Sequence, residues 1–373
     1  MKEKSKILIT NSHLKIGGIE ESLVNLLKFI DSNKYEIDLF LFEKEGLLLN
    51  DIPSNINVYE INNNNRTNKK LIKLLIRVPL LNKMIIRLKI KKVYDYAIAF
   101  NGYNNITDMF AALVKAKKKY IWIHSDYKNR INLQSKFKKQ YNRMKFKYKY
   151  FDKIVAVSKG SMQNFGILMP QYKDKLDYCY NLIDEVEIKE KLQEKPDTTL
   201  TGDIKIISVG RLVPQKGFER FVEIIEKLKY KIKDKKIVGY IIGDGPEKEK
   251  LIKLVKVKKI EKNVKFLGQK SNPFPLIKQA DLFLLTSYIE GFGLVLIEAL
   301  LCGIPIVVPK VSSGKEICND IAPPNTSVLV ANNIDSIYSG TISAINELIG
   351  KNFKYNINEY NQKATYKIKQ LLK

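Results

Sequence analysis

The sequence has little cysteine and no long apolar run, and each scarcity excludes a class of protein. Its 373 residues include three cysteines, with no Cys-X-X-Cys pair and no spacing typical of a metal site. So few cysteines, and an odd number of them, predict a protein of a reducing compartment rather than a secreted domain held by disulfides. No window approaches the ~18 consecutive apolar residues of a membrane span, and the run Ile7 to Ile9 is too short for a signal peptide. We therefore expect a cytoplasmic protein whose membrane contact is at most peripheral.

Acidic residues are also scarce, since 39 Asp and Glu face 65 Lys and Arg, a formal net charge of +26. Two segments, 61–94 and 127–151, contain no acid and interleave their bases with Leu, Ile, Phe or Tyr. That pattern is typical of a cationic amphipathic helix that faces an anionic membrane surface. The alternative is a solvated lysine-rich face produced by a compositional bias toward lysine.

A chain of this length is long for one core, so two domains are expected. Short apolar strands alternate with helices in both halves, which predicts a doubly wound parallel sheet in each. The expected strands are 6–10, 35–42, 57–61, 94–100, 119–124 and 153–157, and then 204–209, 236–242, 263–267, 281–287 and 304–308. We expect domains over 1–182 and 183–352, with a C-terminal segment over 353–373.

The most informative motif is a strand, a glycine-rich turn and a helix around residue 290. The apolar run 281–287 predicts a buried parallel strand, after which Glu290 and Glu298 stand eight positions apart. Such a turn aims the free N–H groups of a helix N-terminus at an anion beyond the carboxyl end of the strand. Glu298 would tilt back toward the turn and accept hydrogen bonds from a diol such as ribose, and Glu290 would face a sugar. The alternative is an acid that serves the helix dipole beside a surface glutamate.

A second loop, Gly210 to Gly217, also follows a strand and precedes a helix. Arg211 offers a planar fork of donors and Lys216 a compact positive charge, five positions apart. The two side chains suit a diphosphate, and they would stabilise the charge of a departing phosphoryl group. Ordinary surface cations are the alternative.

In the first half, Gly17 and Gly18 follow the first strand, but they do not form the Gly-X-Gly-X-X-Gly pattern of a nicotinamide dinucleotide site. They can still bring backbone N–H groups to a phosphate. His124, one of two histidines, ends a strand on the same side and is a candidate active-site residue, as donor to a sugar hydroxyl or partner of the acceptor; a structural histidine is the alternative. His13 lies in the first loop. No Asp-X-Asp occurs, so the paired-carboxylate metal site is missing and no metal is expected.

Together these motifs resemble the retaining glycosyltransferases of family 4, which have the two-Rossmann-domain architecture called GT-B. The resemblance is densest from 204 to 308. It rests on Gly17-Gly18, Asn181 to Asp184, Gly210 to Gly217, Gly243 to Pro246, Val264 to Gly268 and Glu290 to Glu298. It implies an α/β fold of two Rossmann-like doubly wound parallel-sheet domains facing a central cleft, with the last helix returning to the N-terminal domain.

The resemblance also implies an activity and assigns roles to residues. A hexose or N-acetylhexosamine would be transferred from a nucleotide sugar to a lipid-linked or polysaccharide acceptor, and the family alone favours a UDP-sugar as the donor. The transfer would retain the anomeric configuration and would need neither a metal nor another cofactor. Arg211 and Lys216 would bind the diphosphate, Glu298 the ribose, and His124 would lie beside the sugar. The resemblance further implies that the transferred sugar would contact Glu290, Gly291, Phe292, Gly293 and Leu294. The base would contact Phe266, Leu267 and Gly268. The phosphates would also contact Gly17 and Gly18. Glu290, His124, Lys216 and Arg211 are the candidate catalytic residues.

Three other interpretations remain open. A GT-B-like UDP-sugar 2-epimerase would share the fold but should lack this combination of basic and acidic loops. A nucleic-acid-binding protein is suggested by the net charge, but no helix-turn-helix, zinc or RNA-binding motif supports it, so no nucleic-acid partner is expected. The third is a non-catalytic partner of a related transferase, against which the intact site residues argue.

Overall fold

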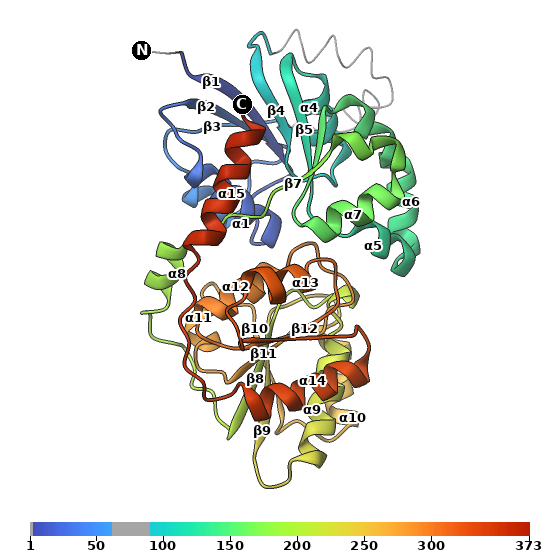
Figure 1. Cartoon of the computed structure of the whole chain (residues 1–373), viewed down its shortest axis with the longest axis vertical. Coiled ribbons are helices and arrows are strands. Elements are labelled where there is room, and N and C mark those ends of the chain that lie inside the picture. The colour runs from blue at the N-terminus through green and yellow to red at the C-terminus, as the bar shows by residue number, and fades with distance from the viewer. Residues whose placement is uncertain (1–2, 62–89) are drawn as a thin grey trace. The chain divides into compact units, whose positions relative to one another are not determined.

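The computed structural model describes residues 3–61 and 90–373, which form two compact units (Figure 1). Unit 1 comprises Met1–Ile183 with Asn361–Lys373, and unit 2 comprises Asp184–Tyr360. The division after Ile183 lies one residue from the expected boundary, and most of the expected C-terminal segment belongs to unit 1. The helix expected over most of 61–94 lies outside the described residues.

Unit 1 contains a parallel sheet of seven described strands in the order β3-β2-β1-β4-β5-β6-β7. The strands are β1 (Ser5–Asn11), β2 (Tyr35–Leu41), β3 (Asn57–Glu60), β4 (Tyr94–Ala99), β5 (Ala116–Ile123), β6 (Lys153–Ala156) and β7 (Leu176–Tyr178). The helices are α1 (Gly18–Phe29), α4 (Asn105–Leu113), α5 (Tyr127–Leu133), α6 (Ser135–Met144) and α7 (Lys159–Leu168), with short 3-10 helices η1 (Leu47–Asp51), η2 (Lys145–Tyr150) and η3 (Pro170–Lys175). Because the sheet is covered by helices, the inner strands are apolar on both faces.

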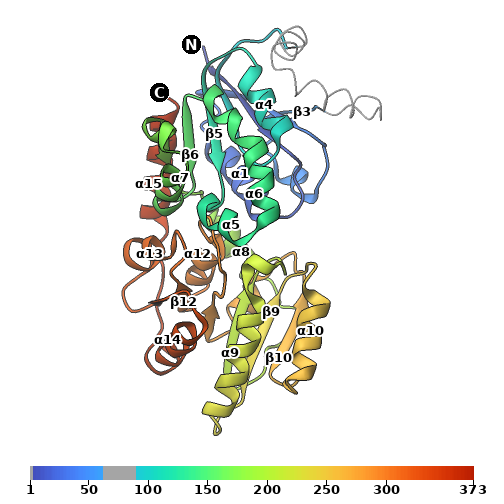
Figure 2. The same cartoon turned by 90° about the vertical axis from the view of Figure 1, so that its right-hand side faces the viewer.

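Unit 2 contains a second parallel sheet, in the order β10-β9-β8-β11-β12-β13. The strands are β8 (Ile204–Val209), β9 (Ile237–Ile242), β10 (Val264–Gly268), β11 (Leu282–Leu284), β12 (Ile306–Pro309) and β13 (Ser327–Val330). The helices are α8 (Glu185–Lys191), α9 (Phe218–Lys231), α10 (Lys248–Val257), α11 (Phe274–Ile277), α12 (Leu294–Leu301), α13 (Gly314–Glu316) and α14 (Ile334–Glu347), with the 3-10 turn η4 (Pro214–Lys216) and the π-helix η5 (Ile317–Ile321). Figure 2 shows α9 and α10 beside β9 and β10.

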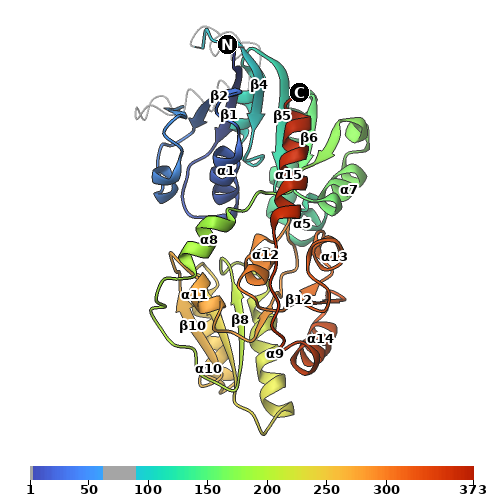
Figure 3. The ribbon, with the colours of Figure 1, turned by 60° about the vertical axis from the view of Figure 1, so that its left-hand side comes forward.

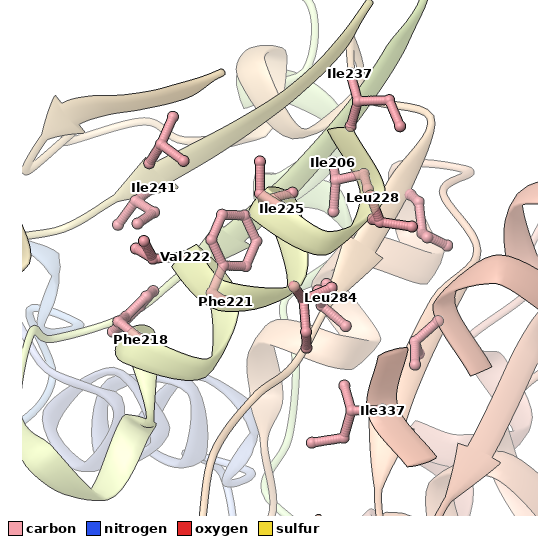
Figure 4. Close-up of a cluster of buried hydrophobic side chains, with 14 of the residues drawn as sticks. Ile206, Phe218, Phe221, Val222, Ile225, Leu228, Ile237, Ile241, Leu284 and Ile337 are labelled. Carbon is pink, nitrogen blue, oxygen red and sulfur yellow. The ribbon is translucent and has the colours of Figure 1, made fainter. Parts of the chain in front are cut away.

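The core of unit 2 forms because α9 presents an apolar stripe to the sheet. Phe218, Phe221, Val222 and Ile225 recur at helical spacing, and all four are at most 3% exposed (Figure 4). Gly239 of β9 faces this stripe, where an added Cβ would lie 2.6 Å from Ile225. The packing therefore fixes the start of α9, and with it the loop that precedes the helix.

The last helix, α15 (Asn358–Leu371), packs onto unit 1 for most of its length (Figure 3). The Lys367 ammonium lies 2.7 Å from a carboxylate oxygen of Asp177, in β7. Asn361 donates to the carbonyl of Ile183 over 2.8 Å, and Tyr35 donates to the carbonyl of Leu372 over 3.2 Å. The C-terminal residues thus complete the unit that the N-terminal residues begin.

The segment 127–151, expected as one basic helix, is three pieces instead. Gln134 lies between α5 and α6 with extended backbone angles, φ −128° and ψ 99°, which ends the first helix. After Met144 the chain tightens into η2, whose Tyr148 and Lys147 are fully buried. An amphipathic pattern alone did not reveal these breaks because each piece keeps basic residues at its surface.

Candidate active site

The candidate site of unit 2 lies where the strand order reverses. β8 and β11 are neighbours, and the chain leaves them in opposite directions along the sheet, toward β9 and toward β12. Their carboxyl ends carry the loops 210–217 and 285–293. In open parallel sheets this reversal point is where ligands bind, because the two loops leave a crevice between them.

The two loops are joined through their backbones. Tyr288 N–H donates to the carbonyl of Gln215 over 2.9 Å, and the Thr286 hydroxyl donates to the carbonyl of Lys216 over 3.3 Å. Gly217 has φ 61°, and a Cβ there would lie 2.4 Å from the carbonyl oxygen of Thr286. Only glycine fits this left-handed, crowded position, so Gly217 both caps α9 and permits the loops to touch.

Lys216 and Glu290 form an ion pair across these loops. The Lys216 ammonium donates to Glu290 Oε1 over 2.7 Å, and the Ser287 hydroxyl donates to the same oxygen over 2.6 Å. The Glu290 side chain is 8% exposed and that of Lys216 is 22% exposed. Both of these hydrogen bonds end on Oε1 and not on Oε2. The arrangement leaves one carboxylate oxygen and part of the ammonium available to a ligand.

Two serines that sequence reasoning missed hold the glycine-rich turn. The Ser312 hydroxyl donates to the carbonyl of Glu290 over 2.6 Å, and the Ser313 hydroxyl donates to the carbonyl of Phe292 over 2.5 Å. Both follow β12, the next strand along the sheet. A polar pair shortly after a buried strand was the signal that could have identified them.

The glycine-rich turn delivers the chain into α12. Gly293 has φ 84° and caps the helix, so Leu294 is its first residue and Glu298 its fifth, half-buried. Gly291 and Phe292 are buried, and the Phe292 ring stacks on Tyr360 with centroids 6.0 Å apart. This geometry places a helix N-terminus and the Glu290 carboxylate on the same short turn.

Arg211 lies in the first of these loops but apart from the ion pair. Its side chain is exposed, and it makes no hydrogen bond or ion pair with a residue that the structure describes. The adjoining backbone is fixed, because Leu212 N–H donates to the carbonyl of Asp244 over 2.9 Å. Gly243 and Gly245 make this approach possible, since a Cβ on either would lie within 2.4 Å of a carbonyl oxygen of the Arg211 loop. The guanidinium can therefore reorient toward a ligand while its loop stays in place.

The segment Phe266, Leu267 and Gly268 ends β10, two strands from β8. The Phe266 side chain is half-buried and packs against the core of unit 2, and base binding by this segment stays a prediction. Gly268 has φ 72°, and its carbonyl accepts from Gly243 N–H over 2.8 Å. The structure thus ties this segment to the loop after β9.

In unit 1 the corresponding reversal point lies between β1 and β4. Gly17 precedes α1, and Gly18 borders open space, since a Cβ added there would meet no atom within 4 Å. Glu20 folds back over Gly17, where a Cβ would lie 2.6 Å from its carboxylate. Burial raises the pKa of Glu20 above its ordinary value, and His13 lies 3.7 Å from it. An acid therefore already occupies the neighbourhood where a phosphate was expected.

His124 follows β5, and its Nε2 lies 2.8 Å from the carbonyl oxygen of Phe100. Because a carbonyl only accepts, this nitrogen carries the proton, and Nδ1 is an acceptor in the neutral ring. Burial lowers the pKa of His124 to about 4, so the ring is neutral near pH 7. In this tautomer the ring offers an acceptor at Nδ1, and a place for His124 beside the sugar or the acceptor stays a prediction.

No group of three or more His, Cys, Asp or Glu that could hold a metal ion occurs within 3–61 and 90–373. Over the same residues, no helix is long and apolar enough to cross a membrane. The cysteines are free, and burial raises the pKa of the Cys318 thiol to about 11.

Both loops of this site lie inside a region that matches a known family. Residues 189–363 match the family model of glycosyl transferases group 1. The match includes Arg211, Lys216, Glu290 and Glu298, and it stops short of unit 1 apart from the start of the C-terminal helix.

Curated relatives carry related names. The chain is 30% identical over 188 residues to the O-antigen biosynthesis glycosyltransferase WclY of Escherichia coli, covering 48% of this chain and 51% of the relative. It is 36% identical over 171 residues to the N-acetylgalactosamine-N,N'-diacetylbacillosaminyl-diphospho-undecaprenol 4-alpha-N-acetylgalactosaminyltransferase of Campylobacter jejuni, covering 45% of this chain and 44% of the relative. The matched region thus spans about half the length of these curated relatives.

Among solved structures, the chain resembles TarM of S. aureus, crystallised with fondaparinux, alpha-GlcNAc-glycerol and UDP. The TM-score is 0.68 at 16% identity, covering 99% of this chain and 97% of that one. The likeness confirms the expected α/β fold of two Rossmann-like, parallel-sheet domains, the architecture of the GT-B glycosyltransferases.

Proposed function

We propose that the protein is a retaining, metal-independent glycosyltransferase that moves a hexose or N-acetylhexosamine from a nucleotide diphosphate sugar to a hydroxyl. The observation that carries the proposal is the ion pair of Lys216 with Glu290 at the reversal point of the unit 2 sheet. The match of residues 189–363 to glycosyl transferases group 1 supports it. It is further supported by relatives named for transfer in O-antigen and lipid-linked glycan synthesis.

The ion pair suits a substrate that carries two phosphates beside a sugar. The ammonium of Lys216 is shared with only one oxygen of Glu290, so it can also donate to a phosphoryl oxygen. Glu290 Oε2 can accept a hydrogen bond from a hydroxyl of the sugar attached to that phosphate. As the glycosidic bond to phosphate breaks, Lys216 and the exposed Arg211 would stabilise the growing charge of the leaving diphosphate. These cations would supply what a divalent metal supplies elsewhere.

We propose UDP as the nucleotide. The structural neighbour TarM was crystallised with UDP, and the backbone at Phe266 to Gly268 would bind the base. Glu298, in the second turn of α12, would bind the ribose. In unit 1, His124 would accept a hydrogen bond from an acceptor hydroxyl through Nδ1.

The donor is tested first by a thermal-shift screen over UDP-, GDP- and ADP-sugars. A ligand that binds only the native form stabilises it by ~2.7 kcal/mol at a hundred times its dissociation constant. We expect UDP-hexoses to raise the melting temperature, and the increase to vanish in Lys216→Ala. Transfer to a lipid-linked acceptor should then proceed in EDTA and keep the anomeric configuration, which NMR of the product reports. Loss of transfer in EDTA, or inversion, would contradict this assignment.

We also propose that unit 1 binds the anionic inner face of the cell membrane, where a lipid-linked acceptor would be presented. Of the two basic segments, 127–151 lies within the described residues, and it exposes Leu133 (48%) and Phe146 (37%) among lysines. The exposed lysines of this surface are Lys136, Lys138, Lys139, Lys145 and Lys149. Each base near an anionic leaflet contributes about 1 kcal/mol to binding.

Vesicle sedimentation tests this surface. The triple change of Lys136, Lys138 and Lys139 to Gln should reduce partitioning to anionic vesicles and leave partitioning to neutral vesicles unchanged. The matched control changes three exposed lysines of unit 2, Lys253, Lys256 and Lys262, to Gln. Equal loss in both triple variants would mean that net charge, and not this surface, governs binding.

A further inference from the structure

The residue Tyr288 lies between Ser287 and Glu290 and is held from two sides by the first turn of α9. The guanidinium carbon of Arg220 lies 3.5 Å from the centroid of the Tyr288 ring. The Tyr288 hydroxyl donates to Glu219 Oε1 over 2.8 Å. Adjacent residues of one helix thus hold the face and the hydroxyl of the same ring.

Arg220 also reaches a third element. Its Nη1 donates to Asn332 Oδ1 over 2.6 Å, in the segment between β13 and α14. The Asn332 amide in turn donates to the carbonyl of Tyr288 over 3.2 Å. Arg220 therefore fixes Tyr288 twice, through its ring directly and through its backbone by way of Asn332.

The backbone that is held in this way carries the candidate site. Ser287 and Glu290 flank Tyr288 in sequence, and their side chains are hydrogen-bonded to one another. Lys216, the partner of Glu290, stands four residues before Arg220 at the same end of α9. A rotation of the Tyr288 peptide would move the Glu290 carboxylate relative to Lys216.

We propose that Arg220 is a positioning residue that sets the place of Glu290 in the donor site, an inference that rests on the proposed function. Arg220 does not contact the ion pair itself; it acts through Tyr288 and Asn332. This role needs a planar group that stacks on a ring while donating from its edge, which a guanidinium does and an ammonium does not. Lysine should therefore fail to replace it.

The experiment compares Arg220→Lys and Arg220→Met with a control on the same helix, Lys227→Met, which removes a cation paired with exposed Asp335. Calorimetry measures the affinity for UDP and for UDP-glucose and UDP-N-acetylglucosamine, and steady-state kinetics measures kcat and KM for the donor. We expect both Arg220 variants to lose about tenfold or more in kcat/KM, since small misplacement of a site group has effects of that size. Affinity for UDP without a sugar should stay parental, because Lys216 and Glu298 remain, and Lys227→Met should match the parent throughout.

Amide hydrogen exchange of the peptide covering 285–293 gives a readout without turnover, and it should be faster in both Arg220 variants but not in Lys227→Met. Tyr288→Phe, which keeps the ring that stacks on Arg220 and loses only the hydroxyl, should remain near parental. If the parent binds no nucleotide sugar, the proposed function fails and takes the donor-site role of Arg220 with it. If the parent binds and turns over while Arg220→Lys equals it in kcat/KM and exchange, the inference about Arg220 alone is wrong. Equal loss of UDP and UDP-sugar affinity would likewise overturn it, as the mark of general destabilisation.

Discussion

The sheets of the two units share the order of their first six strands, but the charged residues at the point where that order reverses are placed differently. In unit 2 the ion pair of Lys216 and Glu290 lies on the two loops themselves and is partly open. In unit 1 the loops after β1 and β4 meet through neutral groups, as where the Asn104 amide donates to the Ser12 hydroxyl over 3.1 Å. The comparison teaches that the sheet decides where a site can form, and the side chains decide which chemistry it has.

Unit 1 also has an ion pair near its reversal point, but this pair is sealed inside. Lys147 and Asp108 are both fully buried and in direct contact. The Lys147 ammonium and the Tyr127 hydroxyl both donate to the carbonyl of Gly102, over 2.7 and 3.0 Å. Desolvation raises the pKa of Asp108 and lowers that of Lys147. Charge in unit 1 thus holds the loop after β4, whereas charge in unit 2 remains within reach of a ligand.

The largest effect is expected when the buried ion pair of Lys147 and Asp108 is broken. Lys147→Met should destabilise unit 1 by about 3–5 kcal/mol, because it leaves the Asp108 carboxylate buried without a partner. Trp122, the single tryptophan of the chain, is buried in unit 1 and reports its unfolding by fluorescence in urea. The double variant with Asp108→Leu should recover much of the loss, because no charge is then left buried. An unchanged transition in Lys147→Met would show that the pair is not structural.

The next largest effect is expected when the partly exposed ion pair of Lys216 and Glu290 is broken. Lys216→Ala and Glu290→Ala should each remove about 3–4 kcal/mol of transition-state stabilisation and so slow turnover, because each loses a group that meets developing charge. Both variants should keep the parental unfolding transition, which separates them from Lys147→Met.

A matched control exists at the opposite edge of the same two strands. Lys205 at the start of β8 pairs with Asp281 just before β11 over 2.8 Å. Lys205→Ala should leave turnover near parental. A similar loss of turnover in this control would remove the functional difference between the two edges.

Acid provides a smaller test of unit 1. The folded pKa of His124 is about 4, against an ordinary value of 6.5, so the unfolded chain takes up a proton first as the pH falls. Stability should therefore be complete above pH 6.5 and decline toward pH 4, by about 2 kcal/mol once partial exposure of the ring is allowed for. The Trp122 transition of His124→Gln should decline less over the same range. Parallel pH profiles for the parent and the variant would contradict the shift.

The smallest effect sharpens the account of unit 2. Ser287→Ala removes one of the two hydrogen bonds to Glu290 Oε1. It should weaken the affinity for the nucleotide sugar by about 1 kcal/mol, measured by calorimetry. Ser343→Ala removes an exposed hydroxyl that donates to Glu347, and it should have no effect. A loss as large as that of Lys216→Ala would mean that Ser287 itself binds the donor.

Sequence reasoning located the strands of unit 2 well because β8 and β9 are mostly apolar and each is followed by a glycine. It missed α4 and α7 in unit 1, although Asn104 and Ser158 cap them with side-chain hydrogen bonds. Gly160 and Gly166 weaken the helical pattern of α7. Short strands such as β7 and β13, three and four residues long and only half-buried, have too little pattern to be recognised.

The extent of the strand before Glu290 also differed from expectation. The apolar run 281–287 predicted seven residues of strand, but β11 ends at Leu284. Thr286 and Tyr288 turn away from the sheet because they hydrogen-bond the loop that carries Lys216. A longer strand would have placed Glu290 farther along, beyond the reach of that lysine.

The sequence by itself determined that each half alternates strands and helices, and that one glycine-bearing loop is basic and another acidic, because period, composition and turn residues are local. Only the tertiary structure decided that Lys216 pairs with Glu290, 74 positions away, and that Arg220 and Asn332 hold the residue between Ser287 and that glutamate. The physical reason is that β8 and β11 become neighbours through the sheet, where backbone hydrogen bonds between strands far apart in sequence set which loops meet.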